Sequence, residues 1–144
     1  MTSPHPILFL SGAGLPAWIW EEVRHRLGDH ETQVAPRPGR TAGLCDYAEA
    51  ALDSMSAERF TVVAHSAGGV VGAEVVRLAP QRVSGFLAVS AIVPRPGGSF
   101  LTAMPVPNRW LLGAAMRVFG TRPPDAALRE TLAHGLDEPT CPLL

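Results

Sequence analysis

The sequence predicts an α/β protein in which helices cover both faces of a parallel sheet. Short apolar runs end at glycine-rich turns and alternate with segments of helical spacing, four runs with three intervening helices within about the first 93 residues. That alternation is typical of a parallel sheet. The chain has 144 residues, of which 47% are hydrophobic and 17% charged, so it can bury one core.

The first two strands and helices are expected within residues 6–55. Residues 6–10 form a continuous apolar run that stops at Ser11-Gly12-Ala13-Gly14, as a strand buried on both faces would. Residues 15–27 carry an apolar residue every fourth position, which predicts an amphipathic helix that ends at Gly28. A weaker strand is expected around residues 32–36 and a second helix over residues 44–55.

The strongest predicted strand covers residues 60–64, which are apolar and rich in β-branched side chains. It ends at His65-Ser66-Ala67-Gly68-Gly69, and a helix over residues 70–79 then closes before Pro80. Residues 83–93 supply a further strand. We therefore assign residues 1–93 to the α/β core.

Residues 94–144 have a different character, because a proline- and glycine-rich linker leads into helical pieces without a convincing strand. We expect them to form a helical lid followed by an irregular tail. The lid would line a pocket of moderate size with apolar side chains: Phe100, Leu101, Met104, Trp110, Leu111 and Met116.

Composition argues against several classes of partner. The 12 basic and 13 acidic residues give a net charge of -1 without a concentrated patch of either sign, so neither nucleic acid nor an anionic membrane surface is expected as a partner. No obvious membrane span or secretory signal is visible. Cys45 and Cys141 lie far apart without zinc-ligand spacing, which predicts no metal site and favours a reducing cytoplasm.

Ser66 is the candidate nucleophile. It lies between a β-branched strand and a helix, with the small residues Ala64 and Gly68 two positions before and after it. A strained strand-to-helix turn needs small residues there, and it lifts the serine hydroxyl to the start of a helix, where a developing anion is favoured. The alternative is a serine that only caps the helix, but the whole spacing favours the turn.

The segment Ala64-His65-Ser66-Ala67-Gly68 resembles the nucleophile elbow of the α/β-hydrolase fold, with Ala64 in place of the usual first glycine. Residues 9–14 followed by Ala17-Trp18-Ile19-Trp20 are similar to the His-Gly turn and W-x-W helix of the plant methylesterase and hydroxynitrile lyase branch, with Ser11 where histidine is usual. The likeness covers roughly residues 6–100. It implies a serine hydrolase of the esterase type that acts on a small apolar ester-like substrate without a cofactor; ester, amide, lactone, thioester and cyanohydrin chemistry all stay open.

The resemblance also implies an oxyanion hole made of backbone N–H groups. The Ala67 N–H directly follows the nucleophile, and the Ala13 N–H comes from the turn after the first strand, where Gly12 and Gly14 allow a close approach. Such donors would stabilise the tetrahedral oxyanion formed in acyl transfer.

The acid and the histidine of a triad are not evident. The only histidine after Ser66 is His134, which we expect on the surface of the lid. Of the acids between them, Glu74 is expected to face solvent and Asp125 to cap a helix. Efficient turnover by this chain would point instead to His134 with Asp125 or Glu130 completing the site from the lid, or to a partner chain that supplies both groups. His65 is interpreted as structural.

No strand follows the predicted lid, so we expect a truncated form of this fold with weak activity or none. Truncation would leave residues 83–93 as an exposed apolar edge strand, through which the chain could self-associate.

Two other interpretations stay open. Residues 12–17 match G-x-G-x-x-A after a strand, as in a Rossmann dinucleotide site, where Arg37 would suggest NADP. That interpretation leaves the Ser66 elbow unexplained. The chain could also be a non-catalytic remnant that binds a small ligand or a partner.

Overall fold

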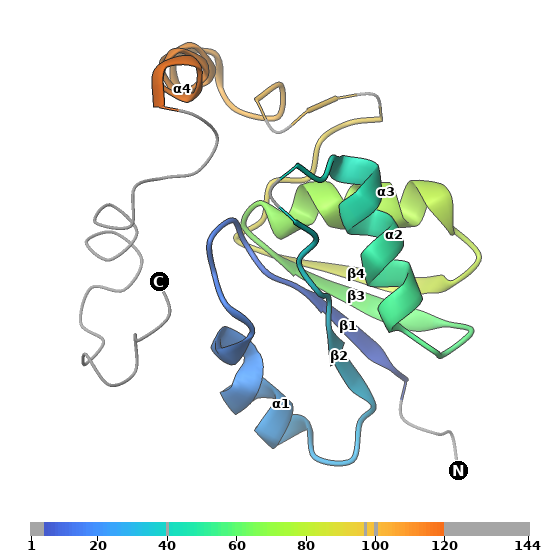
Figure 1. Cartoon of the computed structure of the whole chain (residues 1–144). Coiled ribbons are helices and arrows are strands. Elements are labelled where there is room, and N and C mark those ends of the chain that lie inside the picture. The colour runs from blue at the N-terminus through green and yellow to red at the C-terminus, as the bar shows by residue number, and fades with distance from the viewer. Residues whose placement is uncertain (1–4, 40, 97, 100, 120–144) are drawn as a thin grey trace.

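The computed structural model describes residues 5–39, 41–96, 98–99 and 101–119. Four parallel strands, β1 (Ile7–Leu10), β2 (Thr32–Val34), β3 (Phe60–His65) and β4 (Val83–Val89), form one sheet in the order β2-β1-β3-β4 (Figure 1). The predicted class is confirmed: this is an α/β protein with a parallel sheet.

Helices cover both faces of the sheet (Figure 1). A 3-10 turn η1 (Ala17–Trp20) and helix α1 (Glu21–Leu27) lie on one face, and α2 (Leu44–Ser54) and α3 (Gly68–Leu78) on the other. Helix α4 (Val106–Phe119) follows beyond the carboxyl ends of the strands. No helix in the described residues is long and apolar enough to cross a membrane.

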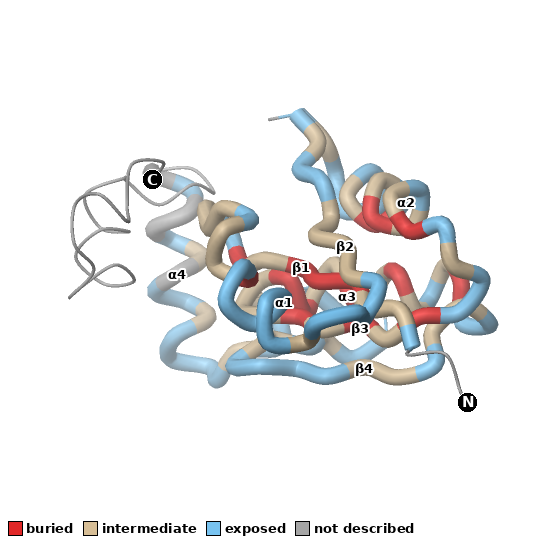
Figure 2. The backbone as a smooth tube through the Cα atoms, turned by 90° about the horizontal axis from the view of Figure 1, so that it is seen from below, coloured by how far each residue is buried: buried red, intermediate tan, exposed pale blue. Residues whose placement is uncertain are grey.

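The core lies between the sheet and the helices α2 and α3. Parallel register aligns Leu8 with Val62 and Leu10 with Ala64, so these four side chains point to the same face. They pack against small and apolar residues of α2 and α3, including Ala48, Ala51 and Val75. Figure 2 shows this burial in β1 and β3, while most of β4 is exposed.

The helix predicted over residues 15–27 is wrong in its start and in its buried face. The chain passes through η1 before α1 begins at Glu21, and no residue of α1 is buried. The buried residue of this segment is Trp20, because the 3-10 turn packs its ring against that of Phe9 on β1, with 4.7 Å between the ring centroids. Val23, which the periodicity placed in the apolar stripe, is exposed.

The last predicted strand is also too long, since β4 ends at Val89 rather than continuing to residue 93. Ser90 has a φ of 44°, a left-handed conformation that takes the chain out of the strand. The following segment turns toward β3, where the Ile92 N–H donates a hydrogen bond of 3.0 Å to the Ser66 carbonyl oxygen.

The expected lid is described only up to Phe119. Trp110 and Leu111, predicted to line a pocket, are 72% and 77% exposed on α4, so that prediction is wrong for these two residues. The division into a core over residues 1–93 and a lid over residues 94–144 stays a prediction.

Candidate active site

The strand β3 ends in a sharp turn at Ser66. Ser66 has a φ of 53°, which is uncommon for a residue with a side chain and in keeping with the strained turn predicted there. Helix α3 starts at Gly68, two residues earlier than the sequence predicted, so Ser66 and Ala67 alone connect strand and helix. The Ser66 carbonyl oxygen accepts hydrogen bonds from the N–H groups of Gly69 at 3.1 Å and Ile92 at 3.0 Å, which hold the turn from two sides.

The small residues on either side of Ser66 are required by close backbone contacts. A Cβ atom on Gly68 would lie 2.4 Å from the carbonyl oxygen of Leu10, at the end of β1. Ala64 is fully buried between Leu10 and Ala88, its partners in the neighbouring strands. A larger side chain at either position would push the strands or α3 apart.

The turn after β1 packs directly against this elbow. The Leu15 N–H donates to the Gly12 carbonyl oxygen at 3.2 Å, and Gly14 has a φ of 76°, so residues 12–15 form a β-turn with glycine at its left-handed position. A Cβ atom on Gly12 would lie 2.9 Å from the Ser66 Cβ. The absence of a side chain at Gly12 therefore lets the two turns approach each other.

The two expected oxyanion donors have free N–H groups. Within the described part of the chain, neither the Ala13 nor the Ala67 N–H has a hydrogen-bond acceptor. Ala67 also precedes the first turn of the 11-residue helix α3, whose dipole favours negative charge there.

His65 and Ser11 support the site from the face that carries η1. The His65 ring packs edge to face against the Trp20 ring, with 6.4 Å between the ring centroids. This contact is in keeping with the structural role expected for His65. The Trp20 indole N–H donates to the Ser11 Oγ at 2.9 Å, so Ser11 anchors the buried tryptophan to the turn after β1. No sequence pattern indicates that hydrogen bond, because it joins two polar atoms nine residues apart.

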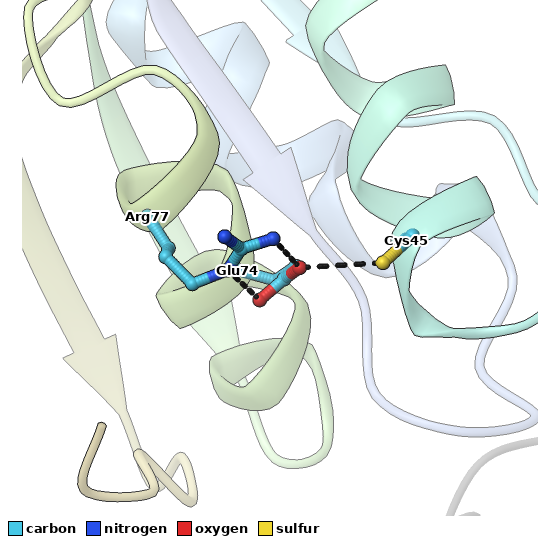
Figure 3. Close-up of polar contacts among 3 residues, drawn as sticks. All are labelled: Cys45, Glu74 and Arg77. Carbon is cyan, nitrogen blue, oxygen red and sulfur yellow. Dashed lines mark hydrogen bonds and ion pairs between the residues drawn. The ribbon is translucent and has the colours of Figure 1, made fainter. Parts of the chain in front are cut away.

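Glu74 was predicted to face solvent, and this prediction is wrong. Its side chain is only 14% exposed and its carboxylate bridges α2 and α3 (Figure 3). It accepts hydrogen bonds from Arg77, at 2.6 and 2.8 Å, and from the Cys45 thiol at 3.4 Å. The Arg77 hydrogen bonds lower the pKa of Glu74. This carboxylate is therefore engaged between two helices.

The other residues considered for the triad, Asp125, Glu130 and His134, lie outside the described residues, as does Cys141. Among the residues that the structure describes, no three His, Cys, Asp or Glu side chains are grouped to hold a metal ion.

The dinucleotide interpretation does not hold. A Rossmann sheet places its third strand beyond its second, in the order 3-2-1-4, whereas β3 here pairs with β1. Arg37, the candidate NADP contact, instead donates hydrogen bonds to the carbonyl oxygens of Gly12 and Leu15.

Comparisons with known proteins agree with this fold. The family model described as "Alpha/beta hydrolase family" matches residues 7–142. Polyneuridine aldehyde esterase is 23% identical over 67% of this chain and 44% of its own, with a TM-score of 0.55. An extracellular alpha/beta-hydrolase from a Paenibacillus species is 20% identical over 89% of this chain and 59% of its own, with a TM-score of 0.68. Tomato methylketone synthase I is 19% identical over 82% of this chain and 49% of its own, with a TM-score of 0.59.

No match to a curated protein is found by sequence. The chain spans between 44% and 59% of the length of the three related structures. Because the family model covers nearly the whole sequence and the sheet carries the same fold, the chain belongs to the alpha/beta hydrolase family.

Proposed function

We propose that Ser66 is the nucleophile of an esterase-type serine hydrolase site, with the N–H groups of Ala67 and Ala13 as its oxyanion hole. The observation that carries the proposal is the left-handed backbone of Ser66, in contact with a glycine turn from the neighbouring strand. Such strain is found where a side chain must be presented to a substrate. The substrate class we assign is a small apolar ester.

In the proposed reaction the Ser66 Oγ attacks the ester carbonyl carbon, and the carbonyl electron pair moves onto the oxygen. The hydroxyl proton passes to a base, and for the described residues acting alone this base is solvent. Collapse of the oxyanion restores the carbonyl and expels the alcohol oxygen with its bonding pair, leaving an acyl-serine that water hydrolyses. The two amides act on the oxyanion alone.

Hydrolysis of p-nitrophenyl acetate by the 144-residue chain tests the proposal. A serine enzyme that lacks its base still accelerates hydrolysis about 10³- to 10⁴-fold over water, because the oxyanion hole and substrate binding remain. We expect slow release of p-nitrophenolate in that range and covalent labelling of Ser66 by a fluorophosphonate probe, both lost in Ser66→Ala.

Ser90→Ala is the matched control. Ser90 also follows a parallel strand with a positive φ, but no glycine turn is packed against it in the described residues. It should keep the activity and the labelling. If wild type and Ser66→Ala release p-nitrophenolate equally and neither is labelled, the non-catalytic interpretation, a ligand-binding protein of the same fold, replaces this proposal.

A further inference from the structure

Arg37 reaches the turn after β1 from the neighbouring strand. β2 pairs with β1 up to Val34, and the Ala35 N–H extends this pairing with a hydrogen bond of 2.9 Å to the Phe9 carbonyl oxygen. Arg37 follows two residues later, beside the turn that β1 leads into. One terminal nitrogen, Nη2, donates to the Gly12 carbonyl oxygen at 2.8 Å and also to the Leu15 carbonyl oxygen.

The hydrogen bond to Gly12 determines where the Ala13 N–H points. The Gly12 carbonyl and the Ala13 N–H belong to one planar trans peptide unit, in which they point in opposite directions. The carbonyl oxygen accepts from Arg37 and from the Leu15 N–H, so both of its lone pairs are used. This holds the peptide plane, and the Ala13 N–H faces away from Arg37 without an acceptor of its own among the described residues.

We infer that Arg37 is a positioning residue that fixes the Gly12–Ala13 peptide, so that the Ala13 N–H is oriented as an oxyanion donor before substrate binds. The inference rests on the proposed function, because it assigns a partner to that same site. In this role Arg37 acts through the peptide that it holds, by its hydrogen bonds to the Gly12 and Leu15 carbonyl oxygens. Its guanidinium also polarises the peptide it holds, since hydrogen bonds in series strengthen one another.

The kinetic test compares Arg37→Ala, Arg37→Lys and wild type with p-nitrophenyl acetate. Complete loss of an oxyanion donor lowers kcat about 10²- to 10³-fold. A donor that is present but poorly oriented should lower kcat by a smaller factor. We expect Arg37→Ala to lower the Ser66-dependent kcat about 10- to 100-fold with KM within about twofold of wild type. One nitrogen serves both carbonyls, and a lysine ammonium has three donors, so Arg37→Lys should recover most of the lost kcat.

Arg82→Ala is the matched control. Arg82 likewise donates to backbone carbonyl oxygens, those of Leu52, Met55 and Ala57, but it lies at the opposite end of the sheet, before β4 begins. Its loss should lower stability and leave kcat unchanged. An Arg82→Ala variant with the same fall in kcat would show that Arg37 acts only through stability, and would overturn the inference.

A second readout does not depend on activity. Backbone ¹⁵N relaxation should show the order parameter of the Ala13 amide falling from about 0.85 to below about 0.6 in Arg37→Ala. The Ala67 amide, and Ala13 in Arg82→Ala, should stay rigid. A rigid Ala13 amide in Arg37→Ala overturns the inference even if Ser66 is the nucleophile. If Ser66→Ala is as active as wild type, the proposed function is wrong. The order parameter of the Ala13 amide still decides in that case whether Arg37 holds the Gly12–Ala13 peptide.

Discussion

A Cβ atom on Gly68 would lie 2.4 Å from the Leu10 carbonyl oxygen and 2.9 Å from its carbonyl carbon. Both are backbone atoms of a strand that pairs on either side, so they cannot rotate away as a side chain would. The position excludes even the smallest side chain. Glycine at this position thus brings α3 closer to β1 than any other residue type would permit.

We therefore expect Gly68→Ala to lower the free energy of unfolding by about 1–3 kcal/mol or more, the usual cost of overpacking. Urea unfolding measures it. Gly39→Ala is the control, because a Cβ atom there would have no neighbour within 4 Å among the described residues. An unchanged unfolding midpoint for Gly68→Ala would mean that α3 and β1 are not in contact at this glycine.

The elbow could be predicted from sequence because its requirements are local. Ala64, Ser66 and Gly68 fall within five consecutive residues, and each needs only a small or nucleophilic side chain at that place. Arg37 was misinterpreted for the opposite reason. Its contacts join residues 22 and 25 positions apart, and no periodicity or motif encodes them.

At the scale of elements, α2 and α3 are joined by a polar contact as well as by the core. Cys45 on α2 donates to Glu74 on α3, which also accepts from Arg77 one turn later on the same helix (Figure 3). The Glu74 carboxylate raises the pKa of Cys45, first by accepting the thiol hydrogen bond and then by its charge. Cys45 is exposed, so its titration can be followed by alkylation.

Glu74→Gln should lower the pKa of Cys45, because the negative charge that opposes the thiolate is gone while Arg77 remains. At a fixed, mildly alkaline pH more thiolate is then present, so iodoacetamide should react faster. The rate is measured against pH in a Cys141→Ser background. Glu49→Gln should shift the curve less, because Glu49 is the smallest of the contributors to the raised pKa. A curve that moves to higher pH in Glu74→Gln would contradict the contact in Figure 3.

The existence of the strands and helices was predictable, and some of their ends were not. β1 is a continuous apolar run, β3 and β4 are mostly apolar, and the periodicity of α2 is strong, whereas β2 gives a weaker signal. The ends of α1 and β4 depend on tertiary contacts, namely the Trp20 ring against Phe9 and the Ile92 N–H on the elbow. A four-residue apolar period cannot distinguish a helix from the 3-10 turn that precedes it.

At the scale of the whole molecule, the strand order of the described residues places β4 at an edge of the sheet, with one face poorly covered. Leu87 on β4 pairs with Val63 on β3, and Val63 pairs with Phe9 on β1. These three side chains therefore lie on the same face of the sheet, the face that carries η1 and α1. Trp20 covers Phe9, but Leu87 and Val89 are 55% and 41% exposed. The strand Val83–Val89 contains no charged residue and no proline, the features by which natural edge strands avoid pairing.

We expect this edge to drive self-association of the isolated chain, because pairing of two β4 edges would satisfy free backbone groups and shield the exposed leucine and valine side chains. Sedimentation velocity should show an average mass that rises with concentration. Leu87→Lys should keep the chain monomeric to higher concentration, because a charge on the edge strand opposes pairing. Val23→Lys removes an exposed apolar side chain from α1, away from the edge, and should associate like wild type. If both substitutions reduce association equally, the effect comes from a general gain in solubility rather than from the β4 edge. If the wild-type chain is monomeric at every concentration, the β4 edge does not pair.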